Sequence, residues 1–125
     1  MRFYIFLDTF NYNAHTTASD ALWAGLPVVT KTGEGFAARV ASSLLSAAGL
    51  PELITKSEQQ YEALIMNLYE NPQMLAKIKE KLLKNCSSKP LFDTQEYTKC
   101  LEKGYQLAYQ RYFDGEETDV IVVRN

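Results

Sequence analysis

The feature that most constrains this chain is the segment of residues 13–30, which reads NAHTTASDALWAGLPVVT. It follows a continuous apolar stretch at 3–7, which is typical of a strand covered on both faces. Apolar residues then recur at helical spacing over 15–24, and Gly25 is placed to end that helix. A second apolar strand is expected over 27–30, opening with its proline. The segment therefore predicts a strand, a helix and a strand joined by short turns.

The expected helix begins with two hydroxyl residues, Thr16 and Thr17. The first N–H groups of a helix have no partner within it, and the aligned peptide dipoles place about half a positive charge there. A strand that leads into such a helix is typical of a site for a phosphate or diphosphate, which the threonine hydroxyls would also contact. Residue chemistry alone fits this interpretation and a plain N-terminal cap about equally well.

The next segment continues the alternation of strands and helices. A helix is expected over 36–48 and a short strand over 53–55, so that residues 1–56 form a βαβαβ unit. Such a unit predicts an α/β fold with a parallel sheet. Three strands, two of them very short, make a sheet that is too small to be complete. We expect either that the chain is a fragment of a longer protein or that another chain supplies the missing strands.

The second half is expected to be helical over residues 57–113. Ser57 is placed to cap a first helix, and Asn71, which precedes a proline, to cap a second. Asp93 is placed to cap a long last helix. The tail at 114–125 is acidic and then apolar from Val120 to Val123, and it is compatible with a docking strand or with a disordered segment.

Bulk composition excludes several classes of protein. The net charge of −2 does not favour nucleic acid or an anionic membrane as a partner. No apolar run approaches the roughly 20 residues that cross a bilayer, and the first residues lack the features of a signal peptide. Cys86 and Cys100 fit neither a metal pattern nor a disulfide framework, so both are expected to be reduced in a cytoplasmic setting.

The order of these motifs resembles the C-terminal catalytic region of the O-GlcNAc transferase and SPINDLY-like family. The resemblance covers nearly the whole chain. It rests on Asp8-Thr9, Asn13-Ala14-His15-Thr16-Thr17, Asp20, Leu22 to Thr30, Gly33 to Ala41, Gly49 to Ile54 and Pro90 to Thr94. It implies a GT-B glycosyltransferase in which this chain is the second half of the Rossmann-like C-terminal lobe. The donor is then UDP-N-acetylglucosamine, and the acceptor is a serine or threonine hydroxyl of a protein.

The resemblance also implies roles for four residues. Thr16 and Thr17 match the pair that contacts the donor diphosphate, His15 matches a histidine of the same donor site, and Asp20 matches the acid that binds the ribose hydroxyls. Asp20 follows Thr16 by four residues and so shares its helix face. Residue chemistry alone would favour a cap or surface group for His15 and a solvated acid for Asp20.

Structural roles are expected for most other notable residues. Trp23 is interpreted as packing in the core or between lobes rather than as a platform for a base. Lys31, Gly33 and Glu34 fit either a sugar or acceptor contact or a simple turn. Arg39 is expected in a structural ion pair. The tyrosines of the last helix are expected to pack in the core or between lobes.

The implied reaction is an inverting glycosyl transfer in which the helix end at Thr16 stabilises the leaving diphosphate, so no metal cofactor is required. The family's phosphate-binding lysine and acceptor-facing groups match no residue here. We therefore assign no catalytic residue and expect the chain alone to be inactive. The expected missing parts are the N-terminal catalytic lobe and tetratricopeptide repeats. Alternatives are a non-catalytic nucleotide-binding module, a protein-interaction domain, and the same fold with GDP-fucose as donor.

Overall fold

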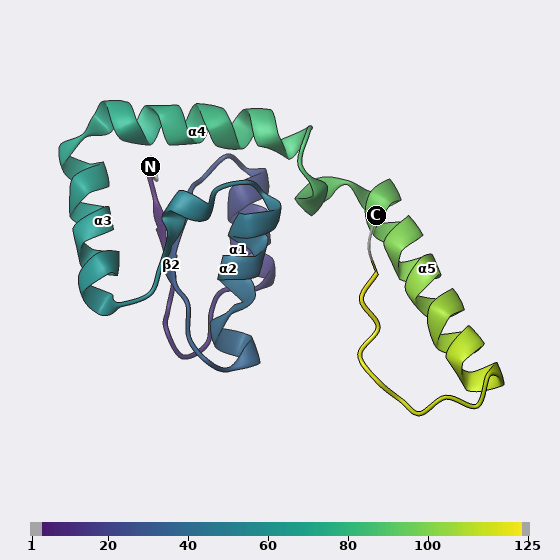
Figure 1. The fold of residues 1–125 in the computed structure, drawn as a ribbon. Coiled ribbons are helices and arrows are strands. Elements are labelled where there is room, and N and C mark those ends of the chain that lie inside the picture. Colours follow the sequence, from purple (N-terminus) through teal and green to yellow (C-terminus); the bar gives the residue numbers. More distant parts are fainter. Residues whose placement is uncertain (1–3, 124–125) are drawn as a thin grey trace. The chain divides into compact units, whose positions relative to one another are not determined.

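The computed structural model describes residues 4–123, which divide into two compact units on either side of the Leu91–Phe92 boundary (Figure 1). Three strands and four α-helices, with short 3₁₀ turns between them, make up the described part of the first unit, and one long helix dominates the second. In chain order they are β1 (Phe6–Leu7), α1 (Thr16–Trp23), β2 (Val28–Lys31), α2 (Val40–Ala47), β3 (Ile54–Thr55), α3 (Glu58–Glu70), α4 (Pro72–Cys86) and α5 (Thr94–Phe113). The α3 and α4 helices thus belong to the same unit as the strands.

The three strands form a parallel sheet in the order β1-β2-β3, which confirms the expected α/β class. Phe6 pairs with Val28 at one edge, and Thr30 pairs with Ile54 at the other. The central strand β2 is buried along most of its length, as its apolar sequence predicts. We expected β1 to be covered on both faces, and this was wrong within the described residues, because Leu7 is 54% exposed. In addition, no described strand pairs with the outer edge of β1.

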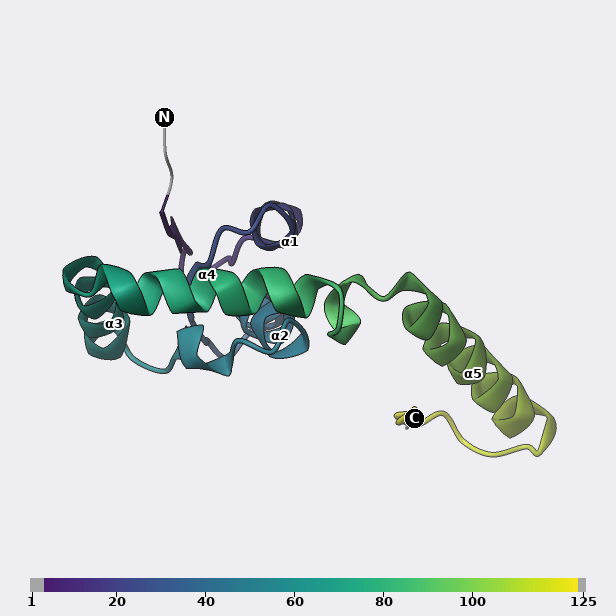
Figure 2. The ribbon, with the colours of Figure 1, turned by 90° about the horizontal axis from the view of Figure 1, so that it is seen from above.

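Helices cover both faces of this sheet. Figures 1 and 2 show α1 and α2 on one side and α3 on the other. Each helix contributes apolar side chains that are fully buried, namely Leu22 from α1, Leu45 from α2 and Leu68 from α3. Burying a leucine contributes about 1.5–3 kcal/mol relative to leaving it exposed, so this apolar interior is the main source of stability in the unit.

Helix α4 lies across the amino ends of the strands. Its Asn85 donates from Nδ2 to the carbonyl oxygen of Ala48 at 2.8 Å, just before the turn that leads to β3. Its Leu83 lies against Gly25, where a Cβ atom would meet the leucine side chain at 3.0 Å. Gly25 ends α1 with φ of 77°, a conformation that favours glycine, as the sequence predicts. With α4 at the amino ends, the carboxyl ends of the strands lie on the opposite edge.

Two predicted helix boundaries differ from the structure. The helix expected over 36–48 is divided into a 3₁₀ turn at Phe36–Ala38 and α2, because Arg39 between them has φ of −122°. Asn71 stands at the N-cap position of α4, but its side chain makes no capping bond. It donates instead to the carbonyl oxygen of Asn67 at 2.9 Å, on the preceding helix. Proline at the first helical position removes one of the donors that a cap would satisfy.

The second unit consists of α5 and the tail that follows it. Asp93 caps α5 by accepting from the N–H of Glu96 at 2.9 Å, which confirms the predicted start. No side chain of α5 is buried, so its tyrosines do not belong to a core within the described residues. The tail forms no strand up to Val123, whose side chain lies close to Gly104 of α5. Within residues 4–123 no helix is long and apolar enough to span a membrane.

Candidate donor-binding site

The candidate site lies where β1 ends and the chain turns into α1. An open cavity of ≈350 Å³ is lined by the end of β1, the connecting loop and the start of α1, including Tyr12, His15 and Thr17. In parallel α/β sheets, ligands bind at the carboxyl ends of the strands. The cavity therefore lies where the sequence places the predicted anion site.

The start of α1 presents free backbone donors. The first backbone bond of the helix runs from the N–H of Ser19 to the carbonyl oxygen of His15 at 3.1 Å. Among residues 4–123, no acceptor meets the N–H groups of Thr16 or Thr17, and the His15 side chain does not cap them. By contrast, Ser57 caps α3 through its hydroxyl. The α1 end thus keeps the donors and the partial positive charge that attract an anion.

The four residues predicted to bind the donor are not all equivalent in the structure. Thr17 lines the cavity together with His15. Thr16 and Asp20 lie outside that lining, on exposed surface of the same helix. The side chains of Thr16, Thr17 and Asp20 form no hydrogen bond or ion pair with other described residues. His15, Thr16 and Thr17 thus stand at the start of α1, whereas Asp20 lies one turn further along the same helix.

His15 is half-buried between two aromatic rings. Tyr12 stacks on it with ring centroids 4.7 Å apart, and Phe36 meets it edge-on at 6.3 Å. Its Nε2 atom is shielded from solvent and has no hydrogen-bond partner among the described residues. A shielded polar atom without a partner costs free energy, which a ligand oxygen would recover. The two rings that contact the imidazole, Tyr12 and Phe36, are themselves largely exposed.

Two buried polar side chains hold the loop between β1 and α1. Asp8 is 4% exposed, and its carboxylate accepts from the N–H of Ala14 at 2.7 Å and from the hydroxyl of Thr30 at 2.6 Å. Asn13 is 1% exposed, donates to the carbonyl oxygen of Thr9 at 2.7 Å and accepts from the N–H of Ala41 at 3.3 Å. These bonds link the loop to β2 and to α2.

A third link comes from α3. The hydroxyl of Tyr61 donates to the carbonyl oxygen of Asp8 at 2.9 Å. Burial, and after it the negative charge of Asp8, raises the pKa of Tyr61 above its ordinary value of 10.0. The phenol therefore remains protonated and able to donate at neutral pH. The Tyr61 ring also meets Phe10 of the loop edge-on at 5.0 Å.

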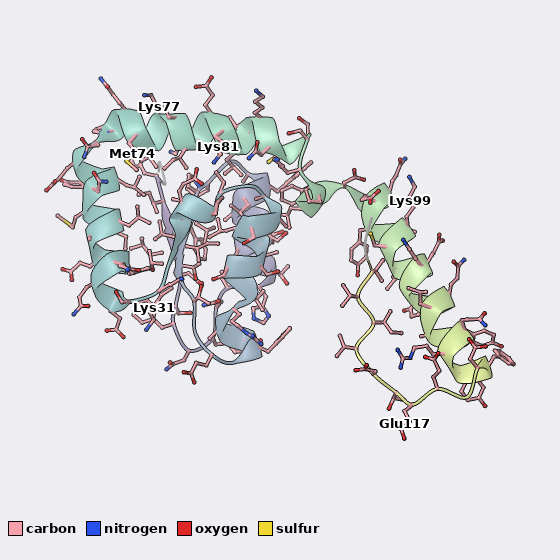
Figure 3. All side chains as sticks on the ribbon, viewed as in Figure 1. Lys31, Met74, Lys77, Lys81, Lys99 and Glu117 are labelled. Atoms are coloured by element: carbon pink, nitrogen blue, oxygen red, sulfur yellow. The ribbon has the colours of Figure 1, made fainter. Side chains whose placement is uncertain are left out.

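The ammonium group of Lys31 is not free, because it contacts other side chains of this unit. Figure 3 shows it at the end of β2 beside the first turn of α3, and its Nζ lies 3.1 Å from Oε1 of Glu58. The same ammonium group stands 4.2 Å from the centroid of the Phe10 ring. Gly33 fits the turn interpretation, because a Cβ atom there would lie 2.6 Å from Cβ of Ala38. Glu34 in the same turn is exposed.

The structure excludes one of the two roles expected for Trp23, packing in the core, and leaves packing between lobes as a prediction; the expectation for Arg39 was wrong. Trp23 is 64% exposed and therefore does not pack in the core of this chain. Arg39 was expected in an ion pair, but it makes none with the described residues; it is exposed at the junction between the 3₁₀ turn and α2, and no acidic side chain of residues 4–123 lies within ion-pair distance. No group of three His, Cys, Asp or Glu side chains within residues 4–123 is arranged to hold a metal ion.

Sequence reasoning assigned no role of their own to Asp8, Asn13 and Tyr12. A signal for Asp8 exists, since an acid directly after an apolar strand stands at the ligand-binding edge of a parallel sheet. Asn13 and Tyr12 lie in a short polar loop, and nothing local separates them from solvated loop residues. Their roles follow from contacts with α2 and with His15 that only the folded chain makes.

Comparison with known proteins gives a consistent result. Residues 3–101 match the model of glycosyl transferase family 41. The chain is 38% identical over 115 residues to a UDP-N-acetylglucosamine–peptide N-acetylglucosaminyltransferase of Caenorhabditis elegans. This alignment covers 92% of this chain and 10% of that protein. It is also 35% identical over 112 residues to SPINDLY of Hordeum vulgare, a probable transferase of the same description. This alignment covers 90% of this chain and 12% of that protein.

A solved structure is similar as well. A mutant O-GlcNAc transferase from Thermobaculum terrenum matches with a TM-score of 0.70 and 35% sequence identity, over 81% of this chain and 19% of that chain. The α/β arrangement of this chain is therefore similar to part of that enzyme. This chain spans only about a tenth of the length of the curated relatives described above.

Proposed function

Because the chain belongs to glycosyltransferase family 41, we propose that it forms the second half of the donor-binding lobe of a GT-B enzyme. That enzyme transfers N-acetylglucosamine from UDP-GlcNAc, with inversion, to serine or threonine hydroxyls of proteins. The observation on which the proposal rests is the uncapped start of α1, with Thr16 and Thr17 exposed beside the cavity at the end of β1. In a member of this family, that arrangement fits the diphosphate of a nucleotide sugar.

The role proposed for the helix end is to stabilise the leaving group. As the acceptor hydroxyl attacks the anomeric carbon, the bond to the diphosphate breaks and UDP gains negative charge. Free N–H groups at Thr16 and Thr17 and the two hydroxyls bind that charge more tightly as it develops, which lowers the barrier. Loss of one such donor typically lowers the rate by about 10²–10³-fold. Fixed backbone donors perform this task without a metal ion.

Asp20 and His15 are proposed to hold the remainder of the donor. Asp20 is exposed one turn beyond Thr16, where its carboxylate can accept from both ribose hydroxyls. His15 offers Nε2, which lacks a partner among the described residues, to a phosphate oxygen or to the sugar. No catalytic base is assigned to this chain. We expect residues 1–125 alone to bind donor without transferring sugar.

The test is a titration of the full-length protein with UDP by calorimetry, together with sugar transfer to a peptide. Thr17→Val removes one hydroxyl at nearly constant volume and should raise the Kd for UDP about 10-fold. Thr94→Val is the matched control, because Thr94 is the first residue of α5 and lies in the other compact unit. It should bind UDP like the wild type.

The same experiment separates the alternatives. Tighter binding of GDP than of UDP would indicate a GDP-sugar donor such as GDP-fucose. UDP binding without transfer by the full-length protein would indicate a non-catalytic nucleotide-binding module. If neither nucleotide binds, and Thr17→Val changes nothing, the chain belongs to a protein-interaction domain and the proposal is wrong.

A further inference from the structure

We propose that Asp8 is a positioning residue for the donor site. Its buried carboxylate fixes the start of α1, so that the free N–H groups and hydroxyls of Thr16 and Thr17 converge on one diphosphate. The inference rests on the proposed function, because it assigns to Asp8 an effect on nucleotide binding without any contact to the nucleotide.

The position of Asp8 is fixed by the sheet and by α3. Its N–H donates to the carbonyl oxygen of Val29 at 3.1 Å, in line with the pairing of β1 and β2. Its own carbonyl oxygen accepts from the Tyr61 hydroxyl at 2.9 Å. The backbone of Asp8 is thus held from β2 on one side and from α3 on the other, and its side chain extends from a rigid base.

From that base, the carboxylate reaches the entry to the helix. Oδ1 accepts from the N–H of Ala14 at 2.7 Å, and Ala14 is the residue directly before His15 at the N-cap position of α1. Oδ2 accepts from the Thr30 hydroxyl at 2.6 Å. One side chain therefore spans from β2 to the last residue before the N-cap. The intervening loop residues Thr9, Asn11 and Tyr12 are exposed, so burial does not fix them.

The two oxygens have different tasks, and this difference makes the proposal testable. The bond from Ala14 holds the helix start, whereas the bond from Thr30 holds the carboxylate itself to β2. Asparagine at position 8 can keep both contacts, because its amide oxygen accepts from Ala14 and its amide NH₂ donates to the Thr30 oxygen. It also removes a negative charge near an anion site. Asparagine at position 8 therefore retains the hydrogen-bond geometry of the aspartate, whereas alanine loses it.

The experiment measures the Kd for UDP and the melting temperature of the full-length protein and its variants. Asp8→Ala should raise the Kd by about 10-fold or more, because the helix start loses its charged acceptor. Asp8→Asn should bind UDP within about 3-fold of the wild type, or more tightly, since geometry is restored and repulsion is reduced. Thr30→Val keeps the bond from Ala14 and should also stay within about 3-fold.

A purely structural role predicts a different pattern. Leu45→Ala, in the buried core on α2, is the control for lost stability and should lower the melting temperature without changing the Kd for UDP. If Asp8→Ala does not fold, Asp8→Ser replaces it, because the serine side chain is one bond shorter and its hydroxyl does not reach the N–H of Ala14. The same increase of about 10-fold in Kd is then expected.

The inference is tested in a protein whose wild type binds UDP and whose Thr17→Val variant binds it more weakly. Three results would then overturn it: an unchanged affinity for UDP in Asp8→Ala or in Asp8→Ser, a loss of affinity in Thr30→Val equal to that in Asp8→Ala, or an affinity of Asp8→Asn no higher than that of Asp8→Ala. If the wild type itself does not bind UDP, the proposed function has failed rather than the role of Asp8.

Discussion

The hydroxyl of Thr30 donates to Oδ2 of Asp8 at 2.6 Å, between two residues that are 22 positions apart in the chain. It joins the central strand to the first residue after β1. Because β1 has only two residues, its backbone ladder is short, and this side-chain bond adds to the attachment of the edge strand. The same carboxylate also holds the entry to α1, so the edge strand and the candidate site share one buried group.

The first prediction concerns the stability of that link. Thr30→Val is nearly isosteric and leaves Oδ2 of a buried carboxylate without its donor, which should lower the free energy of unfolding by about 1–3 kcal/mol. A double-mutant cycle with Asp8→Ala, measured by urea denaturation, should give a coupling energy of about 1 kcal/mol or more. Additive effects of the two substitutions would contradict the assignment.

The second prediction concerns Asn13. Asn13→Ala removes the donor to Thr9 and the acceptor for the N–H of Ala41 in a buried position. The expected loss of stability is about 2 kcal/mol or more, because two polar backbone groups lose their partner. Asn11→Ala is the control, since Asn11 is exposed in the same loop. Thermal unfolding compares the two, and equal melting temperatures would refute a special role for Asn13.

The third prediction follows from the raised pKa of Tyr61. The folded state holds the phenolic proton more tightly than the unfolded chain, so the stabilisation is fully present below the unfolded pKa of 10.0 and is lost as pH rises through the folded pKa. The free energy of unfolding should therefore fall with pH above about 10. Tyr61→Phe should be less stable at neutral pH and show a shallower fall.

Tyr69→Phe serves as the control for that measurement, because Tyr69 is exposed on the same helix. Urea denaturation at several pH values between neutrality and the alkaline range gives the slope for each protein. A Tyr61→Phe slope as steep as that of the Tyr69 variant would mean that the buried phenol does not contribute.

The fourth prediction uses two glycines of one turn. A Cβ atom at Gly33 would lie 2.6 Å from Cβ of Ala38, whereas nothing lies within 4 Å of a Cβ atom at Gly35. Gly33→Ala should therefore cost about 1–3 kcal/mol through overpacking, and Gly35→Ala should change stability by no more than about 0.5 kcal/mol. Melting temperatures of the paired variants decide the matter, and the reverse order would show that the turn is built differently.

The fifth prediction concerns Asp20. Asp20→Asn weakens acceptance from the ribose hydroxyls and should raise the Kd for UDP by about 5–10-fold in the full-length protein. Inorganic pyrophosphate lacks ribose, so its affinity should be unchanged or slightly increased as a negative charge is removed. Glu62→Gln, an exposed acid on α3, controls for net charge. Equal losses for UDP and pyrophosphate would place Asp20 outside the ribose site.

Short-range signals in the sequence were sufficient for the order of the strands and α-helices. The family resemblance is confirmed by the match over residues 3–101. Gly25 ends α1 and Ser57 and Asp93 cap their helices, because each of these signals acts within one turn of the chain. Such signals predicted less well where packing decides the backbone. The break at Arg39 between the 3₁₀ turn and α2 is an example.

The sequence by itself determined that a helix starts with two threonines directly after an apolar strand, because that information lies in adjacent residues. Only the tertiary structure decided which polar side chains hold that helix start. Asp8 meets Thr30, Asn13 meets Ala41, and Tyr61 of α3 reaches Asp8 across 53 positions of the chain. Contacts of this kind depend on how strands and helices pack, and no local pattern encodes them.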